Sequence, residues 1–264
     1  MIRKLTVFIR RYYVLLLAAG AGCSAQTLLQ PSYSAQSIVH AATQTVQALA
    51  PNTIATIYGS NLSFDTVVAG NNVIGATLPE SLDGVTVVVQ GLIAPLFFVS
   101  PTQINFLIPY DLTAGTVTLF VAHQALAGPV VQVQLNSTAP GFFQFNNLVI
   151  ATHLNGSLLS AAAPGSGGEI IVIYIAGLGR VSPDTTSGKL ANSAASIVAA
   201  AQTQVLLAGV PCPQSSLLYI GLAPGFAGLY QINLVVPPLT PANPEVRVQV
   251  GSQISPPGTI IALN

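Results

Sequence analysis

The sequence contains very little charge. Its 264 residues include seven basic and seven acidic side chains, while 51% of the residues are hydrophobic. Soluble domains usually devote about a quarter of their residues to charge. The shortage excludes a chain kept disordered by charge repulsion. No cluster of Lys or Arg follows residue 11, so the electrostatic footprint of a nucleic-acid binder is also absent. A chain of this length forms one large domain or two of ordinary size.

Cysteine is equally scarce. Cys23 and Cys212 are the two cysteines of the chain, and Trp is missing altogether. Because Cys23 lies close to the N-terminus, in a segment with the pattern of a leader, Cys212 is left alone. A lone cysteine forms no intrachain bridge, so the protein is not a scaffold held together by disulfides. Its stability has to come from an apolar core.

The N-terminus has the pattern of a secretory signal peptide. Four of the seven basic residues lie within the first eleven positions, ahead of the apolar run YYVLLLAAGAG at 12–22. This run is shorter than the ~20 apolar residues that span a bilayer. We expect residues 1–25 to be removed on export. The mature chain then carries three basic and seven acidic residues, a net charge of −4, and no transmembrane segment.

Two interpretations of the cleavage site stay open. Gly20-Ala21-Gly22-Cys23 resembles a lipobox, in which the cysteine becomes the lipid attachment site, although Gly20 stands where Leu is usual. Cleavage by ordinary signal peptidase near Ala21 or Ala25 would leave Cys23 without a role. Either way the sequence predicts an exported protein that is periplasmic, attached to the outer membrane or extracellular.

Strand patterns dominate from about residue 50. Short runs rich in Val, Ile and Thr end at Gly, Pro, Asn or Ser, as β-strands do. Two segments are candidate helices instead: the Ala-rich stretch 193–202, which has an N-cap residue before it, and, more weakly, 34–48. The expected strands lie within residues 53–62, 84–91, 115–122, 130–135, 169–179, 203–209, 245–251 and 258–263.

One phrase is written twice. QINFLIP at 103–109 returns as QINLVVP at 231–237, 128 positions later. The flanking runs keep their order, since IYGSNL matches IYIAGLG and VTVVVQG matches TQVLLAG. This order predicts a duplicated β unit, with insertions in the second copy near 221–229. Each copy has the size of an immunoglobulin-like sandwich.

We therefore predict an all-β fold with two tandem immunoglobulin-like β-sandwich domains, at 49–138 and 139–264. A linker segment at 26–48 would join them to the signal peptide. The boundary is expected within STAPGFFQFNN, residues 137–147, where a Pro-Gly turn separates two groups of strands.

These phrases also resemble a known family. APNTIATIYGSNL, LDGVTVVV, APLFFVSPTQINFLIPYDL and GLAPGFAGLYQINLVVP are similar to the Solibacter-type uncharacterised C-terminal domain of exported bacterial proteins, from about residue 38 to the end. IYGSNL and AGLG are also similar to immunoglobulin-like domains of the IPT/TIG type. The resemblance implies export and a pair of immunoglobulin-like β-sandwiches, and it implies no reaction. Cys212 departs from the pattern, because a small apolar residue is usual there.

Catalytic and metal-binding motifs are lacking. His40, His123 and His153 do not have the spacing of metal ligands. The Gly-rich stretches PGSGGE and GLG are not followed by the helix and Lys that a phosphate loop needs. We predict no catalytic residue, no cofactor and no metal. A calcium site would have to use aspartates near loops that lack the spacing of a calcium loop, namely Asp65, Asp83, Asp111 and Asp184.

The duplicated amides are the candidate site. In each copy the apolar residues of the strand alternate toward the core, so Gln103 and Asn105, like Gln231 and Asn233, share the other face about 7 Å apart. Each pair could be a polar platform for a sugar or a peptide. Alternatively the amides satisfy backbone groups of a neighbouring loop, since buried polar groups need partners. Their presence in both copies favours this structural role.

The sequence as a whole predicts a non-enzymatic surface or secreted protein that serves as a binding module or as a spacer. Its expected partner is an extracellular protein or glycan, and not a nucleic acid. The alternative is an accessory protein of an extracellular carbohydrate-active or other hydrolase. A cleft that gathers acidic side chains and a histidine would favour that alternative.

Overall fold

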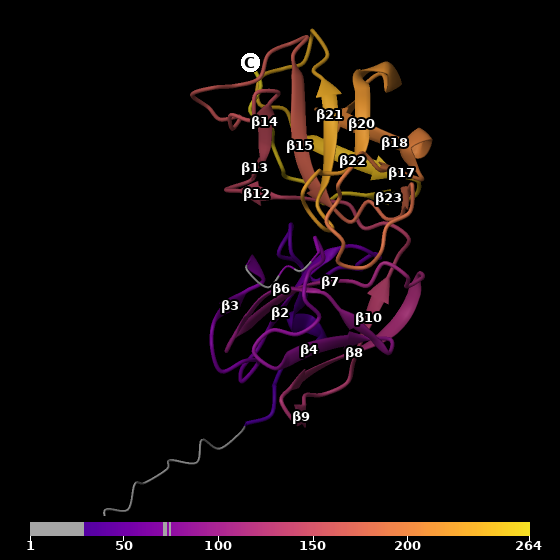
Figure 1. The fold of residues 1–264 in the computed structure, drawn as a ribbon. Coiled ribbons are helices and arrows are strands. Elements are labelled where there is room, and N and C mark those ends of the chain that lie inside the picture. The colour runs from indigo at the N-terminus through magenta and orange to yellow at the C-terminus, as the bar shows by residue number, and fades with distance from the viewer. Residues whose placement is uncertain (1–28, 71–72, 74) are drawn as a thin grey trace, which may run out of the picture.

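The computed structural model describes residues 29–70, 73 and 75–264. The predicted signal peptide and Cys23 lie outside these residues. The described chain is built from β-strands, joined by 3-10 turns at Ala35–Ser37, Ala200–Gln202 and Gln214–Ser216. Within it, no helix has the length and hydropathy needed to cross a membrane. The predicted all-β class is confirmed (Figure 1).

Residues 29–138, here called the first unit, form two antiparallel sheets. The first sheet has the order β1-β2-β7-β6-β3, with β1 Ile38–His40, β2 Ile54–Tyr58, β7 Gln103–Leu107, β6 Leu96–Ser100 and β3 Val67–Val68. The second has the order β10-β8-β4-β5, with β10 Val131–Leu135, β8 Gly115–His123, β4 Val85–Val89 and β5 Leu92–Ala94, while β9 Leu126–Ala127 pairs with β8.

Residues 139–264, the second unit, repeat this arrangement above the first in Figure 1. One sheet has the order β11-β15-β21-β20-β17-β16, with β11 Gly141–Phe142, β15 Ile170–Ala176, β21 Tyr230–Val235, β20 Leu217–Leu222, β17 Ser196–Ile197 and β16 Val181–Ser182; β14 Ala151–His153 pairs with β15. The other has the order β19-β18-β22-β23, with β19 Val210–Pro211, β18 Thr203–Leu207, β22 Val246–Val250 and β23 Gln253–Ile254. The hairpin β12 Gln144–Phe145 and β13 Leu148–Val149 stands apart.

The QIN strand lies inside its sheet in both units, with the same neighbours in the same register. Gln103 of β7 lies opposite Tyr58 of β2, and Gln231 of β21 lies opposite Tyr174 of β15. The strand on its other side carries a register shift at the same place in each unit, between Leu96 and Phe98 and between Leu217 and Tyr219. Apolar side chains alternate toward the core on these strands. The pairing around the QIN strand is therefore the same in both units.

The first unit begins earlier than predicted. β1 pairs with β2 as β14 pairs with β15, so His40 lies opposite Ala55 where His153 lies opposite Ile171. Residues 38–40, expected in a linker at 26–48, are a buried edge strand of the first sheet. The sequence around these residues has only a weak apolar periodicity, so it did not predict a strand here.

Neither predicted helix forms. Segment 193–202 contains β17 and a 3-10 turn, and segment 34–48 contains a 3-10 turn and β1. β17 pairs with β16 on one side and with β20 on the other, and this pairing overrides the helical propensity of the alanines. In both segments the backbone pairs with a neighbouring strand instead, since β1 pairs with β2 at the edge of its sheet.

The buried apolar residues form two clusters, one for each unit, and each cluster takes one side chain from the other unit. Tyr110 of the first unit belongs to the core of the second, and Ala227 of the second belongs to the core of the first. The two units are thus packed together at a junction made by both. Whether each folds alone stays a prediction.

The expected boundary is only partly exposed. Thr138, Ala139 and Phe142 are buried, and the Ala139 amide donates a hydrogen bond to the Gly177 carbonyl at 2.7 Å. The predicted Pro-Gly turn is the start of β11, which pairs with the end of β15. Within 137–147, the hairpin residues from Gln144 to Asn147 lie closer to solvent.

Candidate functional site

Tyr110 fastens the first unit to the second. Its hydroxyl donates a hydrogen bond to the Asp184 carboxylate and accepts one from the Val181 amide at 3.1 Å. The Arg180 guanidinium lies 4.7 Å from the centre of the ring and pairs with Asp184 at 2.8 Å. Desolvation raises the pKa of the Tyr110 hydroxyl, and the hydrogen bond to Asp184 raises it further. The hydroxyl therefore stays protonated and holds the segment from residue 180 in place.

The second unit also contributes side chains that contact the first unit. The Tyr230 hydroxyl donates to the Gly179 carbonyl at 2.5 Å and accepts from the Asn52 side-chain amide at 3.0 Å. Next to it, Ala227 is buried in the first core. Gly228 has φ +65°, and a side chain there would press on the Asn52 carbonyl at 3.0 Å. The insertion near 221–229 that the duplication predicts is thus the loop that completes the junction.

His40 ties the first unit to the segment that enters the second. The Nδ1 atom accepts a hydrogen bond from the Ala42 amide at 3.2 Å, so Nε2 carries the proton and donates to the Ala139 carbonyl at 3.1 Å. Desolvation lowers the pKa of His40 to about 4. The side chain is neutral at physiological pH and both of its nitrogens are used within the protein.

A long loop lies beside this junction. Residues 183–195 connect β16 to β17, and these strands pair with each other, with Ser182 opposite Ser196. The loop therefore closes on itself as an Ω-loop does. Its middle is held against the first unit, because the Leu78 amide donates to Gly188 and the Leu190 amide to Ala76, at 2.9 and 2.8 Å. Long irregular loops in compact proteins are usually functional or disordered. This loop is held in place by its hydrogen bonds to the first unit.

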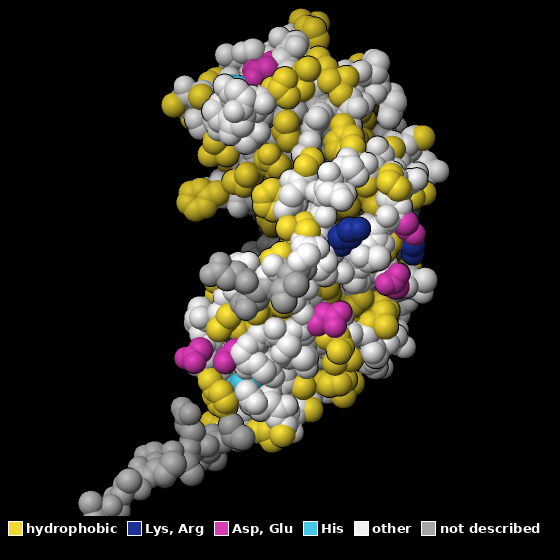
Figure 2. Space-filling model, in the orientation of Figure 1, with side chains coloured by type: hydrophobic (Ala, Val, Ile, Leu, Met, Phe, Trp, Pro, Cys, Tyr) yellow, Lys and Arg dark blue, Asp and Glu magenta, His cyan; other side chains and the backbone are white. Residues whose placement is uncertain are grey.

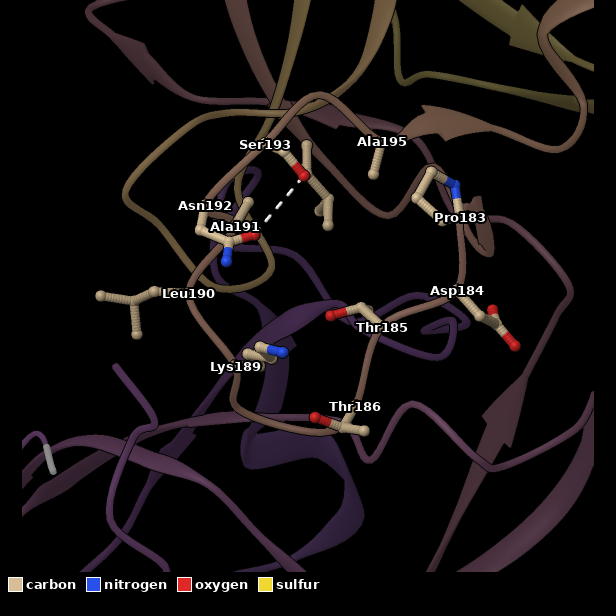
Figure 3. Close-up of a pocket in the computed structure, with 11 residues that line it drawn as sticks. Pro183, Asp184, Thr185, Thr186, Lys189, Leu190, Ala191, Asn192, Ser193 and Ala195 are labelled. Atoms are coloured by element: carbon tan, nitrogen blue, oxygen red, sulfur yellow. Dashed lines mark hydrogen bonds between the residues drawn. The ribbon is translucent and has the colours of Figure 1, made fainter. Parts of the chain in front are cut away.

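The loop encloses an open cleft of about 260 Å³, here called the junction cleft (Figure 3). In Figure 3 the side chains of Thr185, Lys189 and Ser193 point inward, while the Asp184 carboxylate points away. The Ser193 hydroxyl donates to the Asn192 side-chain oxygen at 3.4 Å. The lining consists of Pro183, Asp184, Thr185, Thr186, Lys189, Leu190, Ala191, Asn192, Ser193, Ala195 and Leu222. A concave site with a few convergent polar groups is the usual form of a ligand site.

The predicted amide pairs lie elsewhere, on strands β7 and β21. The Gln103 amide donates to the Asn105 side-chain oxygen at 2.9 Å, and the Gln231 amide donates to Asn233 at the same distance. All four residues are half-buried. The expectation that the amides bind the backbone of a neighbouring loop was wrong. They bind each other along the strand, because residues two apart share a face.

His153 and Glu169 form an ion pair at 2.5 Å at the edge of the second unit. The hydrogen bond with Glu169 raises the pKa of His153. Burial raises the pKa of Glu169, but the bonds from His153 and from the Ser166 amide outweigh it and lower the value. The same turn in the first unit uses the Thr53 hydroxyl, which accepts from the Ala50 amide at 3.1 Å. Glu169 thus has the structural position of a turn-capping side chain.

The other sequence candidates are dispersed. The ring of His123 packs on that of Phe64, with centroids 4.2 Å apart. Asp83 accepts hydrogen bonds from the Ser63 hydroxyl and from two loop amides, and the Ser63 bond is the main reason that its pKa is lowered. Burial raises the pKa of the free Cys212 thiol to about 11. In the described part of the chain, no three His, Cys, Asp or Glu side chains gather as a metal site.

Sequence reasoning missed the junction. The signal was a difference between the two copies of the repeat: Pro109 is followed by Tyr110, whereas Pro237 is followed by Pro238. Comparing the copies for differences, rather than for matches, would have singled out Tyr110.

Comparisons with known proteins give fold likenesses only. No protein-family model matches the chain, and no curated protein matches it. Among solved structures, the surface glycan-binding protein SGBP-B from the Bacteroides ovatus mixed-linkage glucan utilization locus, in complex with a mixed-linkage heptasaccharide, is 11% identical over 82% of this chain, with a TM-score of 0.33. The surface glycan-binding protein PbSGBP-B from Prevotella bryantii is 12% identical over 87%, with a TM-score of 0.26.

Domains 5–6 of the S-layer protein SbsC are 7% identical over 89% of this chain and are covered completely, with a TM-score of 0.29. The chain spans 42% of the length of each of the two glycan-binding proteins. Likenesses this loose do not bear on what the chain binds.

Proposed function

We propose that the protein is an exported, non-enzymatic β-sandwich protein that acts at the cell surface or outside the cell as a binding and spacer module. The reciprocal junction carries the proposal. Tyr110 is fully buried in the second core and Ala227 is buried in the first. Units joined by a small polar interface move relative to each other by default, and this junction removes that freedom. A rigid pair of β units holds a binding site at a set distance from its attachment point.

Export rests on the N-terminal pattern and on the resemblance to the Solibacter-type domain. The basic start, the short apolar run and the small residues after it are those of a leader. Mass spectrometry of the protein recovered from outside the cytoplasm should find an N-terminus between residues 22 and 26, with or without lipid on Cys23. A recovered protein that still begins at Met1 would contradict export by this route.

Rigidity is tested by small-angle X-ray scattering of the mature chain. We expect one elongated particle with a single set of dimensions. Tyr110→Ala should loosen the junction and broaden the distribution of dimensions, whereas Tyr58→Ala, at an exposed ring, should not. A wild-type protein that already samples many distances between its units would contradict the spacer role.

Binding is tested by screening the mature chain on arrays of glycans and extracellular proteins. A module of this kind retains a ligand and leaves it unchanged. Release of new reducing ends from a bound glycan, or cleavage of a bound protein, would overturn the non-enzymatic part of the proposal.

A further inference from the structure

The junction cleft contains one cation turned inward. The side chain of Lys189 is exposed and points into the cleft (Figure 3). In the described part of the chain the ion pairs are His153 with Glu169 and Arg180 with Asp184, so the Lys189 ammonium group has no ion-pair partner there. Basic side chains are rare in this protein, and on the face shown in Figure 2 those that are described gather near the junction.

The acidic residue of the lining does not neutralise Lys189. The Asp184 carboxylate points away from the cleft, accepts the hydrogen bond of the Tyr110 hydroxyl and pairs with Arg180. The Tyr110 bond and then the Arg180 bond lower the pKa of Asp184, so its charge is kept and is balanced outside the cleft. Lys189 is therefore the charged group of the lining that has no ion-pair partner among the described residues, and an ammonium group of this kind attracts an anion.

The remaining lining matches a polyhydroxyl ligand. Thr185, Asn192 and Ser193 present hydroxyl and amide groups that both donate and accept hydrogen bonds, as sugar hydroxyls do. Pro183, which is exposed and lines the cleft, offers apolar surface that can contact sugar C–H groups. The volume of about 260 Å³ lies just under the ~300–1,000 Å³ of sites for drug-sized ligands, which suits one or two units of a longer saccharide chain.

The cleft is built before any ligand arrives. Lys189 forms an antiparallel bridge with Thr77 of the first unit, and its amide donates to the Thr186 carbonyl at 3.2 Å. The Ala191 amide donates to Phe226, and the Gly225 amide donates to Ala191, at 3.0 and 2.7 Å. The loop is thus tied on both sides, and binding would cost little ordering entropy.

We propose that the junction cleft binds a carboxylated saccharide, with Lys189 on the carboxylate and Thr185, Asn192 and Ser193 on the hydroxyls. This inference rests on the proposed function as a binding module and names its ligand class. The site exists only in the folded pair, because Thr77 and Tyr110 of the first unit position the loop that carries it.

The test is isothermal titration calorimetry of the mature chain with trigalacturonate, and with its methyl ester as the neutral match. We expect the free acid to bind and the ester to bind much more weakly, with affinity falling as ionic strength rises. Lys189→Gln should weaken binding of the acid by about tenfold or more, since hydrogen bonds to charged groups are strong. Lys189→Arg should retain binding.

Arg247→Gln is the charge-matched control, because it removes a cation from strand β22, outside the cleft. It should leave the affinity unchanged, and Thr185→Val should reduce it while the melting temperature stays constant. Equal binding of acid and ester, indifference to Lys189→Gln, or preference for an acidic tripeptide over trigalacturonate would overturn the inference. An array ligand that binds independently of Lys189 would leave the binding module standing and remove only this assignment.

Discussion

At the scale of single residues, the two QIN pairs can be compared directly, because their hydrogen bonds differ in one partner. Asn105 accepts hydrogen bonds from Gln103 at 2.9 Å and from the Thr56 hydroxyl at 3.0 Å. Asn233 accepts only the bond from Gln231 among the bonds described, because Val172 occupies the position that corresponds to Thr56. The difference between the two sites is one buried hydroxyl, and it can be measured.

Asn105→Ala should destabilise the protein more than Asn233→Ala. Loss of Asn233 removes one partly exposed hydrogen bond, at a cost of ~0.5–1.5 kcal/mol. Loss of Asn105 also leaves the Thr56 hydroxyl, which is 1% exposed, without its partner, and such a group costs about 1–3 kcal/mol. Unfolding in guanidinium chloride gives both values.

The second substitution Thr56→Val provides the control. In the Thr56→Val background the first site resembles the second, so Asn105→Ala should then cost about as much as Asn233→Ala does alone. If Asn105→Ala is equally costly with and without the Thr56 hydroxyl, the hydrogen bond assigned here does not explain the difference.

At the scale of elements, the turn that ends each QIN strand shows what the junction adds. Pro109 and Tyr110 are buried. Pro238, which corresponds to Tyr110, is exposed, and the Leu239 side chain next to it is 98% exposed. The backbone of the turn is the same, since the Leu112 amide donates to Pro109 as the Thr240 amide does to Pro237. One repeated element is thus core in one unit and surface in the other, according to whether a neighbour covers it.

Gly177 lies in close contact with Ala139, in the segment that connects the two units, and with His40. Gly177, at the end of β15, has φ +80°, and a side chain there would collide with the Ala139 carbonyl and approach His40. Gly177→Ala should therefore strain the backbone and also push the connecting segment away. Gly209→Ala is the control, because Gly209 has φ +79° and open space around it.

We expect Gly209→Ala to cost about 1 kcal/mol, the penalty of a left-handed residue, and Gly177→Ala to cost clearly more. Thermal unfolding of both variants measures the difference, which is the contribution of the close approach alone. Equal losses would mean that the Ala139 contact relaxes freely.

At the scale of the whole molecule, two histidines at equivalent positions make stability depend on pH in opposite directions. His40 has a folded pKa of about 4, below its ordinary 6.5, so the unfolded chain takes up the proton first as pH falls. The stability from His40 is present above pH ~6.5 and is lost toward pH 4, by up to about 3 kcal/mol. The pKa of His153 is raised, so its contribution is present below the ordinary value and is lost as pH rises through the folded one.

Wild-type protein should therefore unfold at lower denaturant concentration at pH 5 than at pH 7. His40→Gln should be less stable at pH 7 and should lose most of this slope, whereas His153→Gln should keep it. An unchanged slope in the His40 variant would show that other groups control acid unfolding in this range.

Proteolysis tests the junction as a whole. Phe145 is 71% exposed in the β12–β13 hairpin, while Thr138, Ala139 and Phe142 are buried. Chymotrypsin should first cut at Phe145, and mass spectrometry should show no early cut at 137–142. Because Tyr110 and Ala227 hold the pieces together, the nicked protein should still elute as one particle in size-exclusion chromatography. Separation of the fragments without denaturant would mean that the junction is weak.

The sequence by itself determined the β class and the duplication. Both depend on local patterns: short runs of β-branched residues, punctuation by Gly and Pro, and the alternation that sends Ile104 and Ile232 inward. The copies of the repeat preserve these patterns because each copy has the same core to fill. The amide pairs were visible for the same reason, although their mutual hydrogen bonds were not.

Only the tertiary structure decided the partnership of the two copies. Tyr110 and Lys189 are isolated residues in the sequence, and no periodicity marks them. They gain their roles because residues 183–195 close on themselves and lie against Thr77 and Tyr110, far away along the chain. A local pattern of apolar and polar residues shows which side chains of a strand face the core of its own unit. A junction depends on surfaces that meet only after both sheets have formed.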